Sequence, residues 1–190
     1  ESAEGHHRLF GFGGADTLSA PEGGRLVGGA DNDVLIGAAR GYASLSAGAG
    51  DDVLIGGASN MLVGSLGSDT LVPLGGANVL LGGRDSDHFV LVDEGSNVAA
   101  GPNLVADFVS GVDKLVFAGS AGSASQPQFS NGSDGLHVAF AGQHVATLLG
   151  VSAAEVDAAT DVVSQSASVV SPLMNAISDV NALQQELSSI

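Results

Sequence analysis

Five aspartates recur along the first half of the chain, and each ends a glycine-rich loop. They are spaced by 17, 19, 17 and 18 residues, at Asp16, Asp33, Asp52, Asp69 and Asp87. Calcium prefers about six to eight hard oxygen ligands, including carboxylates and backbone carbonyls. A glycine-rich loop can turn several carbonyls inward, and the aspartate at its end adds charge. Stacked loops would therefore hold a divalent cation in the gap between each loop and the next.

An apolar residue follows each of these aspartates by two positions, and similar residues recur between the loops at a period near nine. A unit of one loop and one short strand cannot bury its apolar residue alone, but stacked units form a continuous interior ladder. Two units make one coil of about 18 residues, which places the five aspartates on one edge. The predicted anchors are Leu9, Leu18, Leu26, Leu35, Leu45, Leu54, Leu62, Leu71, Leu80 and Phe89, and Val98 is the last expected anchor.

Residues 11–90 resemble the repeats-in-toxin (RTX) family of calcium-binding parallel β-rolls, whose nonapeptide is Gly-Gly-x-Gly-x-Asp-x-apolar-x. The resemblance implies an all-β, right-handed parallel β-roll solenoid of about five coils, with Ca²⁺ as its bound ion. Asp31, Asp51 and Asp85 are either additional ligands or residues in left-handed turns, which aspartate tolerates. The predicted metal ligands are Asp16, Asp31, Asp33, Asp51, Asp52, Asp69, Asp85 and Asp87, with the loop glycines Gly11, Gly13, Gly28, Gly48, Gly64 and Gly82.

The loops of the opposite edge place no aspartate at the equivalent position. Asn60 and Asn78 stand there instead and are expected to form a short hydrogen-bonded ladder without calcium. The residues flanking the anchors are also aliphatic, with Val34, Ile36, Val53, Ile55, Val72 and Val90 on one outer face and Val27, Met61, Val63, Val79 and Leu81 on the other. A solenoid in water should not expose this much apolar surface, so at least one outer face is expected to be covered.

Beyond the repeats, the chain divides into two further segments. Residues 1–98 are the expected roll, residues 99–150 a β-rich cap and residues 151–190 a helical C-terminal segment. Asn103–Phe117 resembles the "x-DF-x-x-G-x-DK-apolar" segment that follows the repeats in many RTX proteins. Strands are expected at 128–130, 136–140 and 144–149, with turns at Asn131-Gly132 and Ala141-Gly142.

The C-terminal segment carries two signals for helices. Ser152–Glu155 reads as a capping box, which predicts a short helix there. Thr160–Val170 is polar and serine-rich, as expected of a linker. Ser171-Pro172 then supplies an N-cap and a first-turn proline for a terminal amphipathic helix. By resemblance, residues 151–190 are either an uncleaved type I secretion signal or a helix that packs on the roll.

Composition excludes several functions. A net charge of −16 repels nucleic acid and anionic membranes. The chain has no cysteine, so thiolate metal sites are excluded, and it has no 18-residue apolar run for a membrane span. Its five histidines lie in different segments, and it lacks the serine-elbow, phosphate-loop and cysteine-nucleophile motifs. The sequence therefore predicts a non-enzymatic module.

The expected function follows from the ion and the family. An acidic, glycine-rich chain with few aromatics cannot easily offset its conformational entropy, so calcium is expected to drive folding outside the cell. The main hypothesis is a secreted or cell-surface module of a larger bacterial protein, such as a surface-layer protein or adhesin. The module would serve folding, export by a type I ABC secretion machinery, and surface association or self-assembly. The alternative is an accessory module of a secreted protease, lipase or polysaccharide epimerase.

Overall fold

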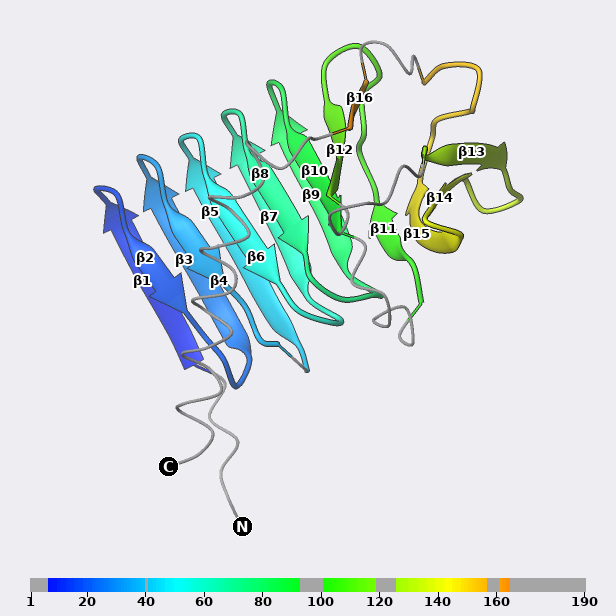
Figure 1. Cartoon of the computed structure of the whole chain (residues 1–190). Helices are drawn as coiled ribbons and strands as arrows, with labels where there is room; N and C mark the ends of the chain where they lie inside the picture. The colour runs from blue at the N-terminus through cyan, green and yellow to red at the C-terminus, as the bar shows by residue number, and fades with distance from the viewer. Residues whose placement is uncertain (1–6, 40, 93–100, 119–125, 157–160, 165–190) are drawn as a thin grey trace.

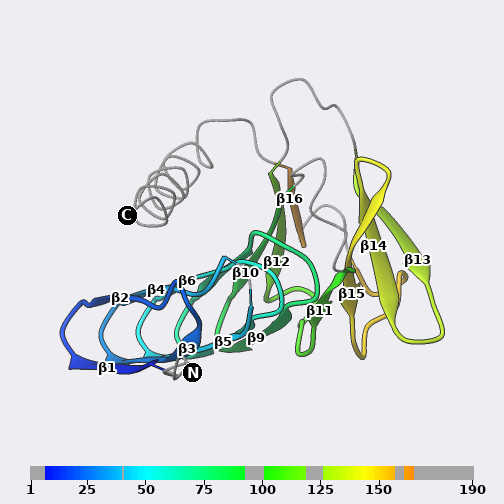
Figure 2. The same ribbon diagram turned by 90° about the horizontal axis from the view of Figure 1, so that it is seen from below.

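Two parallel β-sheets wind together into a roll in the computed structural model (Figure 1). The structure describes residues 7–39, 41–92, 101–118, 126–156 and 161–164. Successive strands alternate between the sheets, so that each coil contributes one strand to each (Figure 2). The first sheet has the order β1-β3-β5-β7-β9-β11-β15-β14-β13, and the second has the order β16-β12-β10-β8-β6-β4-β2. The predicted all-β parallel solenoid of about five coils is confirmed.

The strands are short because each repeat leaves room for only one between two loops. In the first sheet they are β1 (His7–Gly13), β3 (Gly24–Ala30), β5 (Ala43–Ala49), β7 (Met61–Leu66), β9 (Val79–Arg84) and β11 (Asn103–Val105). In the second sheet they are β2 (Thr17–Ser19), β4 (Val34–Ile36), β6 (Val53–Gly56), β8 (Thr70–Pro73), β10 (His88–Val92), β12 (Lys114–Ala118) and β16 (Val162–Ser164).

The anchors stack directly on one another across the coils. Leu26, Leu45, Leu62 and Leu80 are paired in register in the first sheet, and Leu35, Leu54 and Leu71 in the second. All anchors from Leu26 to Phe89 are fully buried in one apolar cluster. Leu9 at the N-terminal end is 37% exposed, because β1 is the end strand of its sheet. The periodicity therefore gave the interior of the roll correctly.

The outer face of the second sheet is buried as well. Ile36, Ile55, Val72, Val90 and Val116 are at most 9% exposed and form a second apolar cluster, separate from the interior. Val27, Val63 and Leu81 on the outer face of the first sheet are half-buried. The prediction that at least one aliphatic outer face is covered is thus confirmed for the second sheet.

The ladders continue beyond the predicted end of the repeats. Val98 lies outside the described residues, but Val105 pairs in parallel with Leu80, and Leu115 pairs with Phe89. The expected linker at 160–170 is wrong at its start, because Val162–Ser164 form β16 and pair in parallel with β12. These positions have the same alternating apolar pattern as the anchors, but longer insertions break their spacing.

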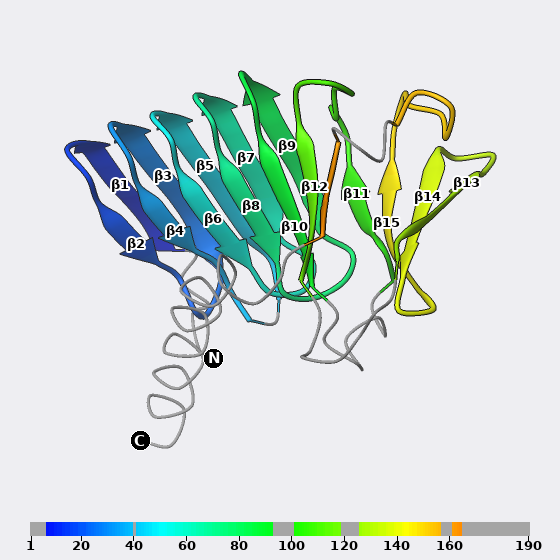
Figure 3. The ribbon, with the colours of Figure 1, turned by 45° about the horizontal axis from the view of Figure 1, so that its top comes forward.

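Three antiparallel strands lie at the C-terminal end of the first sheet (Figure 3). They are β13 (Gln128–Asn131), β14 (Leu136–Phe140) and β15 (Gln143–Leu148), which confirms the predicted hairpins. β15 pairs in parallel with β11, so the hairpins extend the sheet of the roll. The side chains of Leu136, Val138 and Phe140 join the same buried cluster as the anchors.

The predicted helices have different outcomes. Ser152 and Glu155 make the contacts of a capping box, since the Ser152 amide donates to Glu155 Oε2 at 2.8 Å. Residues 153–155 nevertheless form a turn, so the expected helix at this point is wrong. A capping box without a following amphipathic stretch that can pack on the protein closes only a single turn. The terminal helix expected after Ser171-Pro172 lies outside the described residues.

Candidate metal centre

The five repeat aspartates form one ladder along an edge of the roll. Each stands between a strand of the first sheet and the following strand of the second, where the chain turns. The backbone amides of the first four each donate to the Oδ1 atom of the aspartate one coil on, at 2.7–2.9 Å. Asp33, Asp52, Asp69 and Asp87 are at most 1% exposed. The ladder thus holds the Oδ1 atom of these four buried side chains.

The second oxygen of every rung is buried without a hydrogen-bond donor among the described residues. These atoms are the Oδ2 atoms of Asp16, Asp33, Asp52, Asp69 and Asp87. An ionised carboxylate accepts hydrogen bonds but cannot donate any, so neighbouring rungs cannot satisfy one another. A buried polar atom without a partner is costly, and a buried charge costs more. The arrangement calls for a cation at each rung.

Glycines leave the space that these oxygens occupy. A side chain added at Gly28 would place its Cβ 2.3 Å from Asp33 Oδ2 and 2.6 Å from the carbonyl oxygen of Ala47 on the next coil. The same pair of atoms, an aspartate Oδ2 and a carbonyl oxygen of the next coil, lies beside Gly11 and Gly64. Gly82 is likewise next to Asp87 Oδ2. Carboxylate and carbonyl oxygens thus converge at the edge, as a calcium site requires.

Burial and mutual repulsion shift the titration of the rungs. Burial raises the pKa of Asp69 to about 7, with further increases from the carboxylates of Asp52 and Asp87. Burial also raises the pKa of Asp87 to about 6, to which Asp113 and Asp107 contribute. The pKa of Asp52 is raised for the same main reason. The folded ladder therefore favours protons, or a bound cation, over bare carboxylates.

The loop aspartates next to the ladder lie in a different setting. Asp31 and Asp85 have positive φ values of 74° and 75°, the left-handed geometry considered for them from the sequence. Asp31 Oδ2 accepts a hydrogen bond from the amide of Gly14 at 3.0 Å, and Asp51 Oδ1 accepts one from Ser68 at 2.8 Å. These exposed bonds tie successive loops together. The role of these three aspartates as ligands stays a prediction.

Two of the predicted loop glycines have other surroundings. A side chain at Gly13 would meet no atom within 4 Å. Gly48 has φ of +122°, and a side chain there would lie 2.3 Å from the carbonyl oxygen of Gly29. Gly48 therefore allows two coils to stack closely, and neither glycine lies beside an Asp Oδ2 atom as Gly28 does.

Sequence reasoning missed the residues that end the ladder. Asp113 Oδ1 accepts from the Asp87 amide at 3.1 Å, but its Oδ2 accepts from the Val109 amide at 2.7 Å. Asp107 accepts from the amides of Gly82 and Gly83, both at 3.0 Å. The signal was available, because Asp113 precedes Leu115 by two positions, as each rung precedes its anchor. Each oxygen of these two carboxylates has a backbone donor, so they lack the free buried oxygen that the five rungs share.

The opposite edge carries the predicted asparagine ladder. The Asn60 amide donates to Asn78 Oδ1 at 2.7 Å, and the Asn78 amide donates to Asn103 Oδ1 at 3.1 Å. Asn78 Nδ2 also donates to the carbonyl of Gly75 and to Asn103 Oδ1. Asn103 is a further rung that the sequence reasoning did not identify. Each carboxamide supplies its own donors here, so only Asn60 Oδ1, at the start of the ladder, is buried without a partner among the described residues.

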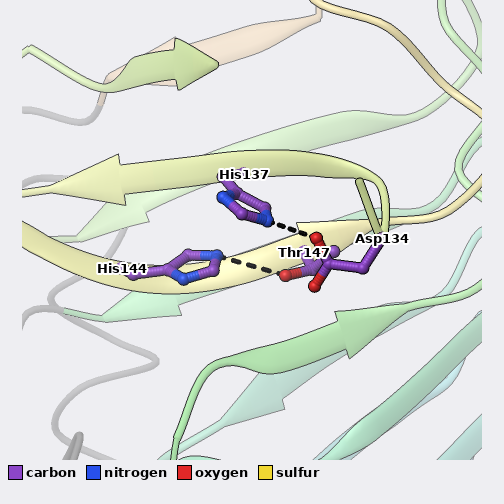
Figure 4. Close-up of polar contacts among 4 residues, drawn as sticks. All are labelled: Asp134, His137, His144 and Thr147. Atoms are coloured by element: carbon purple, nitrogen blue, oxygen red, sulfur yellow. Dashed lines mark hydrogen bonds and ion pairs between the residues drawn. The ribbon is translucent and has the colours of Figure 1, made fainter. Parts of the chain in front are cut away.

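Two histidines that seemed unrelated in sequence meet on the terminal hairpins (Figure 4). His137 and His144 have ring centroids 4.5 Å apart. His137 Nε2 lies 2.6 Å from Asp134 Oδ1, and His144 Nε2 lies 3.1 Å from Thr147 Oγ1. No group of three or more His, Cys, Asp or Glu side chains that could hold a metal occurs in the described part of the chain. The pair is therefore a local polar contact on the hairpins.

The aspartate edge fits calcium even though it forms no such side-chain cluster. Each loop contributes one buried carboxylate oxygen, and backbone carbonyls would supply further oxygens, as is common for calcium. Asp16, Asp33, Asp52, Asp69 and Asp87, with the carbonyls beside Gly11, Gly28 and Gly64, would hold the ions. Bound calcium would supply the positive charge that the stacked carboxylates lack.

Comparison with known proteins agrees with this geometry. The family model of the RTX calcium-binding nonapeptide repeat (4 copies) matches residues 23–39, 44–71 and 59–89. Searches of curated proteins and of solved structures returned no match. The matched residues include four of the five rungs, Asp33, Asp52, Asp69 and Asp87. No helix long and apolar enough to cross a membrane occurs in the part of the chain that the structure describes.

Proposed function

Since residues 23–89 carry RTX calcium-binding repeats folded as a parallel β-roll, we propose that this chain is a module that folds on calcium during export and then joins its parent protein to a surface or to further copies. RTX repeats imply a calcium-binding module of a type I secreted protein. The finer roles, export through the C-terminal segment and association through the roll, are the proposal.

A single observation supports the calcium-dependent folding in this proposal. Five buried carboxylate oxygens in one ladder have no donor among the described residues. The ladder is therefore unfavourable without cations and favourable with them, so binding free energy becomes folding free energy. Extracellular calcium is millimolar, whereas free cytosolic calcium is scarce. The chain would stay loose before export, which suits passage through a narrow exporter, and would fold outside.

Association is supported by the N-terminal end of the roll. β1 is the end strand of the first sheet, and Leu9, Phe10 and Phe12 on it are 37%, 46% and 79% exposed. An exposed apolar end strand offers free backbone groups for pairing with another chain. His7–Gly13 contains no proline or lysine, which commonly protect such strands, and its one arginine, Arg8, lies over the ring of Phe10. A second copy that pairs through β1 would cover this end.

Light scattering during a calcium titration tests the association. Wild-type protein should grow into dimers or larger assemblies once it has folded, and Phe10→Lys should stay monomeric while folding normally. Val109→Lys is the matched control, since Val109 is 49% exposed on the segment at the other end of the roll. A monodisperse wild-type monomer in calcium, or equal effects of the two variants, would contradict association through β1.

Export is tested in bacteria that carry a type I exporter. The full chain should reach the medium, and a variant truncated after residue 164, which keeps β16, should remain inside. A truncated variant that is exported as well as the full chain would place the signal elsewhere. Purified protein from both strains should fold with calcium equally well, which separates loss of export from loss of folding.

A further inference from the structure

One rung of the aspartate ladder departs from the others in its loop. Ala47 occupies the position that is glycine in the other four loops. Strand pairing fixes this equivalence, because Val27 and Gly29 pair with Ser46 and Gly48, which in turn pair with Val63 and Ser65. The stacked residues are Gly11, Gly28, Ala47, Gly64 and Gly82, and each precedes its aspartate by five positions.

The four glycines are required for space and not for backbone conformation. None of Gly11, Gly28, Gly64 and Gly82 has a positive φ. A Cβ added to them would lie only 2.1–2.5 Å from the Oδ2 atom of the following aspartate. Beside Gly11, Gly28 and Gly64 it would also lie 2.5–2.6 Å from a carbonyl oxygen of the next coil. The missing side chain thus makes the space in which two oxygens meet.

At the third loop a methyl group stands where that space would be. Ala47 is fully buried. By the register, its methyl group points toward the oxygens that correspond to those beside Gly28, namely Asp52 Oδ2 and the carbonyl oxygen of Gly64. Asp52 is 1% exposed, and its Oδ2 lacks a donor among the described residues, as in the other rungs. The Asp52 carboxylate is present, but the space beside it is reduced by the Ala47 methyl group.

We propose that Ala47 makes the site next to Asp52 the weakest calcium site of the ladder, which loads last and sets the calcium concentration at which the whole edge is filled. The proposal rests on calcium-dependent folding of the roll. The methyl group restricts how closely the carboxylate and the carbonyl can approach one ion, and calcium sites lose affinity as ligands are displaced. The ladder is thereby divided into two halves, with Asp16 and Asp33 on one side and Asp69 and Asp87 on the other.

Ala47→Gly tests the proposal by restoring the space. Isothermal titration with calcium should show that the weakest binding step becomes about tenfold tighter, and the calcium midpoint of folding in circular dichroism should fall with it. Ala49→Gly is the matched control, because it makes the same change two residues further along β5, where the side chain is only half-buried. Both variants gain the same conformational freedom when unfolded.

The possible results distinguish the role of Ala47 from calcium-dependent folding. An Ala47→Gly midpoint equal to or above that of Ala49→Gly, or a variant that no longer folds in calcium, would overturn the role of Ala47 and leave calcium-dependent folding untouched. If wild type and both variants neither bind calcium nor respond to it, calcium-dependent folding itself fails. The reverse change, Gly64→Ala, should weaken one calcium-binding step by about tenfold, and unchanged affinities there would equally refute the proposal.

Discussion

The two edges of the roll use the same ladder with opposite chemistry. At equivalent positions, one edge stacks carboxylates and the other stacks carboxamides, and in both the backbone amide of one coil donates to the side-chain Oδ1 of the next. Asn78 then uses its Nδ2 group to satisfy neighbouring carbonyls, whereas Asp69 leaves Oδ2 buried without a donor. Among the described residues the carboxamide edge leaves one buried oxygen without a partner, Asn60 Oδ1, whereas the carboxylate edge leaves one at each of five rungs, where a cation would supply the missing charge.

The difference between the two edges explains how folding of the roll can depend on calcium. The carboxamide edge and the apolar ladder favour the roll at all calcium concentrations, while the carboxylate edge opposes it until ions bind. The two edges share every coil, so the state of one decides the stability of the other. A roll with asparagine on both edges would be expected to fold without calcium.

The largest expected effect comes from removing calcium altogether. In a chelator, far-ultraviolet circular dichroism should show little β structure, and calcium should restore it with a midpoint of about 0.1–1 mM, as in extracellular modules. Magnesium at the same concentration should be much less effective, because it demands a small octahedral shell. A spectrum that does not respond to calcium would mean that the carboxylate edge does not oppose folding.

Exchanging the chemistry of the two edges should give the next largest effect. Asp69→Asn should remove about one ion from the calcium stoichiometry, because the rung loses its charge and gains a donor of its own. Asn78→Asp should leave the stoichiometry unchanged and lower the free energy of unfolding by about 1–3 kcal/mol, because buried carbonyls lose their donor.

Calorimetry and urea denaturation at saturating calcium measure both quantities. Stability is thereby compared on fully loaded proteins, so a lower stability is not confused with a lower affinity. The same number of ions in Asp69→Asn as in wild type would show that the edges do not differ in the way inferred from their free oxygens.

Much of the contrast between the two edges could be predicted from the sequence, and there are physical reasons why the rest could not. A period near nine residues brings anchors and aspartates into register, so the interior and both edges could be predicted from spacing. Asp113 and Asn103 were missed as rungs because insertions precede them, although each stands two residues before its anchor. Once a strand has pairing partners, the length of the connecting segment no longer matters, and β16 joins its sheet across such a gap.

Details that depend on the positions of individual atoms, and not on the period of the repeat, could not be predicted from the sequence either. Ala47 looks like a conservative replacement in the repeat, and only the placement of Asp Oδ2 atoms beside the other glycines gives the methyl group a meaning. His137 and His144 meet because two hairpin strands pair with a bulge between Val138 and Ala139. The capping box predicted a helix, but local contacts alone close only a turn.

A moderate effect is expected from pH in the absence of calcium. The folded pKa values of Asp69 and Asp87, about 7 and about 6, lie above the ordinary value of 3.8. The folded ladder thus binds more protons than the unfolded chain, so stability is greatest at acid pH and falls as pH rises from about 4 to 7. Circular dichroism in chelator should show β structure gained on lowering the pH from 7.5 to 5.

The asparagine edge provides the control for this pH dependence. Asp69→Asn should flatten the profile between pH 5 and 7, because the group with the most raised pKa is gone, whereas Asn78→Ala should shift the whole profile without changing its slope. An apo protein that loses β structure on acidification would contradict the sign derived from burial.

The smallest effect is expected within the aspartate edge, where Asp51 stands beside Asp52 and its side chain accepts an exposed bond from the amide of Ser68. If that bond merely links two loops, Asp51→Ala should change the calcium midpoint by less than about twofold, as for most exposed substitutions. Asn32→Ala is the matched change, since Asn32 makes the corresponding bond to the amide of Asp51. Calorimetry decides between the two roles predicted for Asp51. If both variants bind as many calcium ions as wild type, Asp51 is a turn residue that links two loops. If Asp51→Ala alone binds one ion fewer, this carboxylate is a ligand, and two adjacent aspartates, Asp51 and Asp52, bind calcium at this coil.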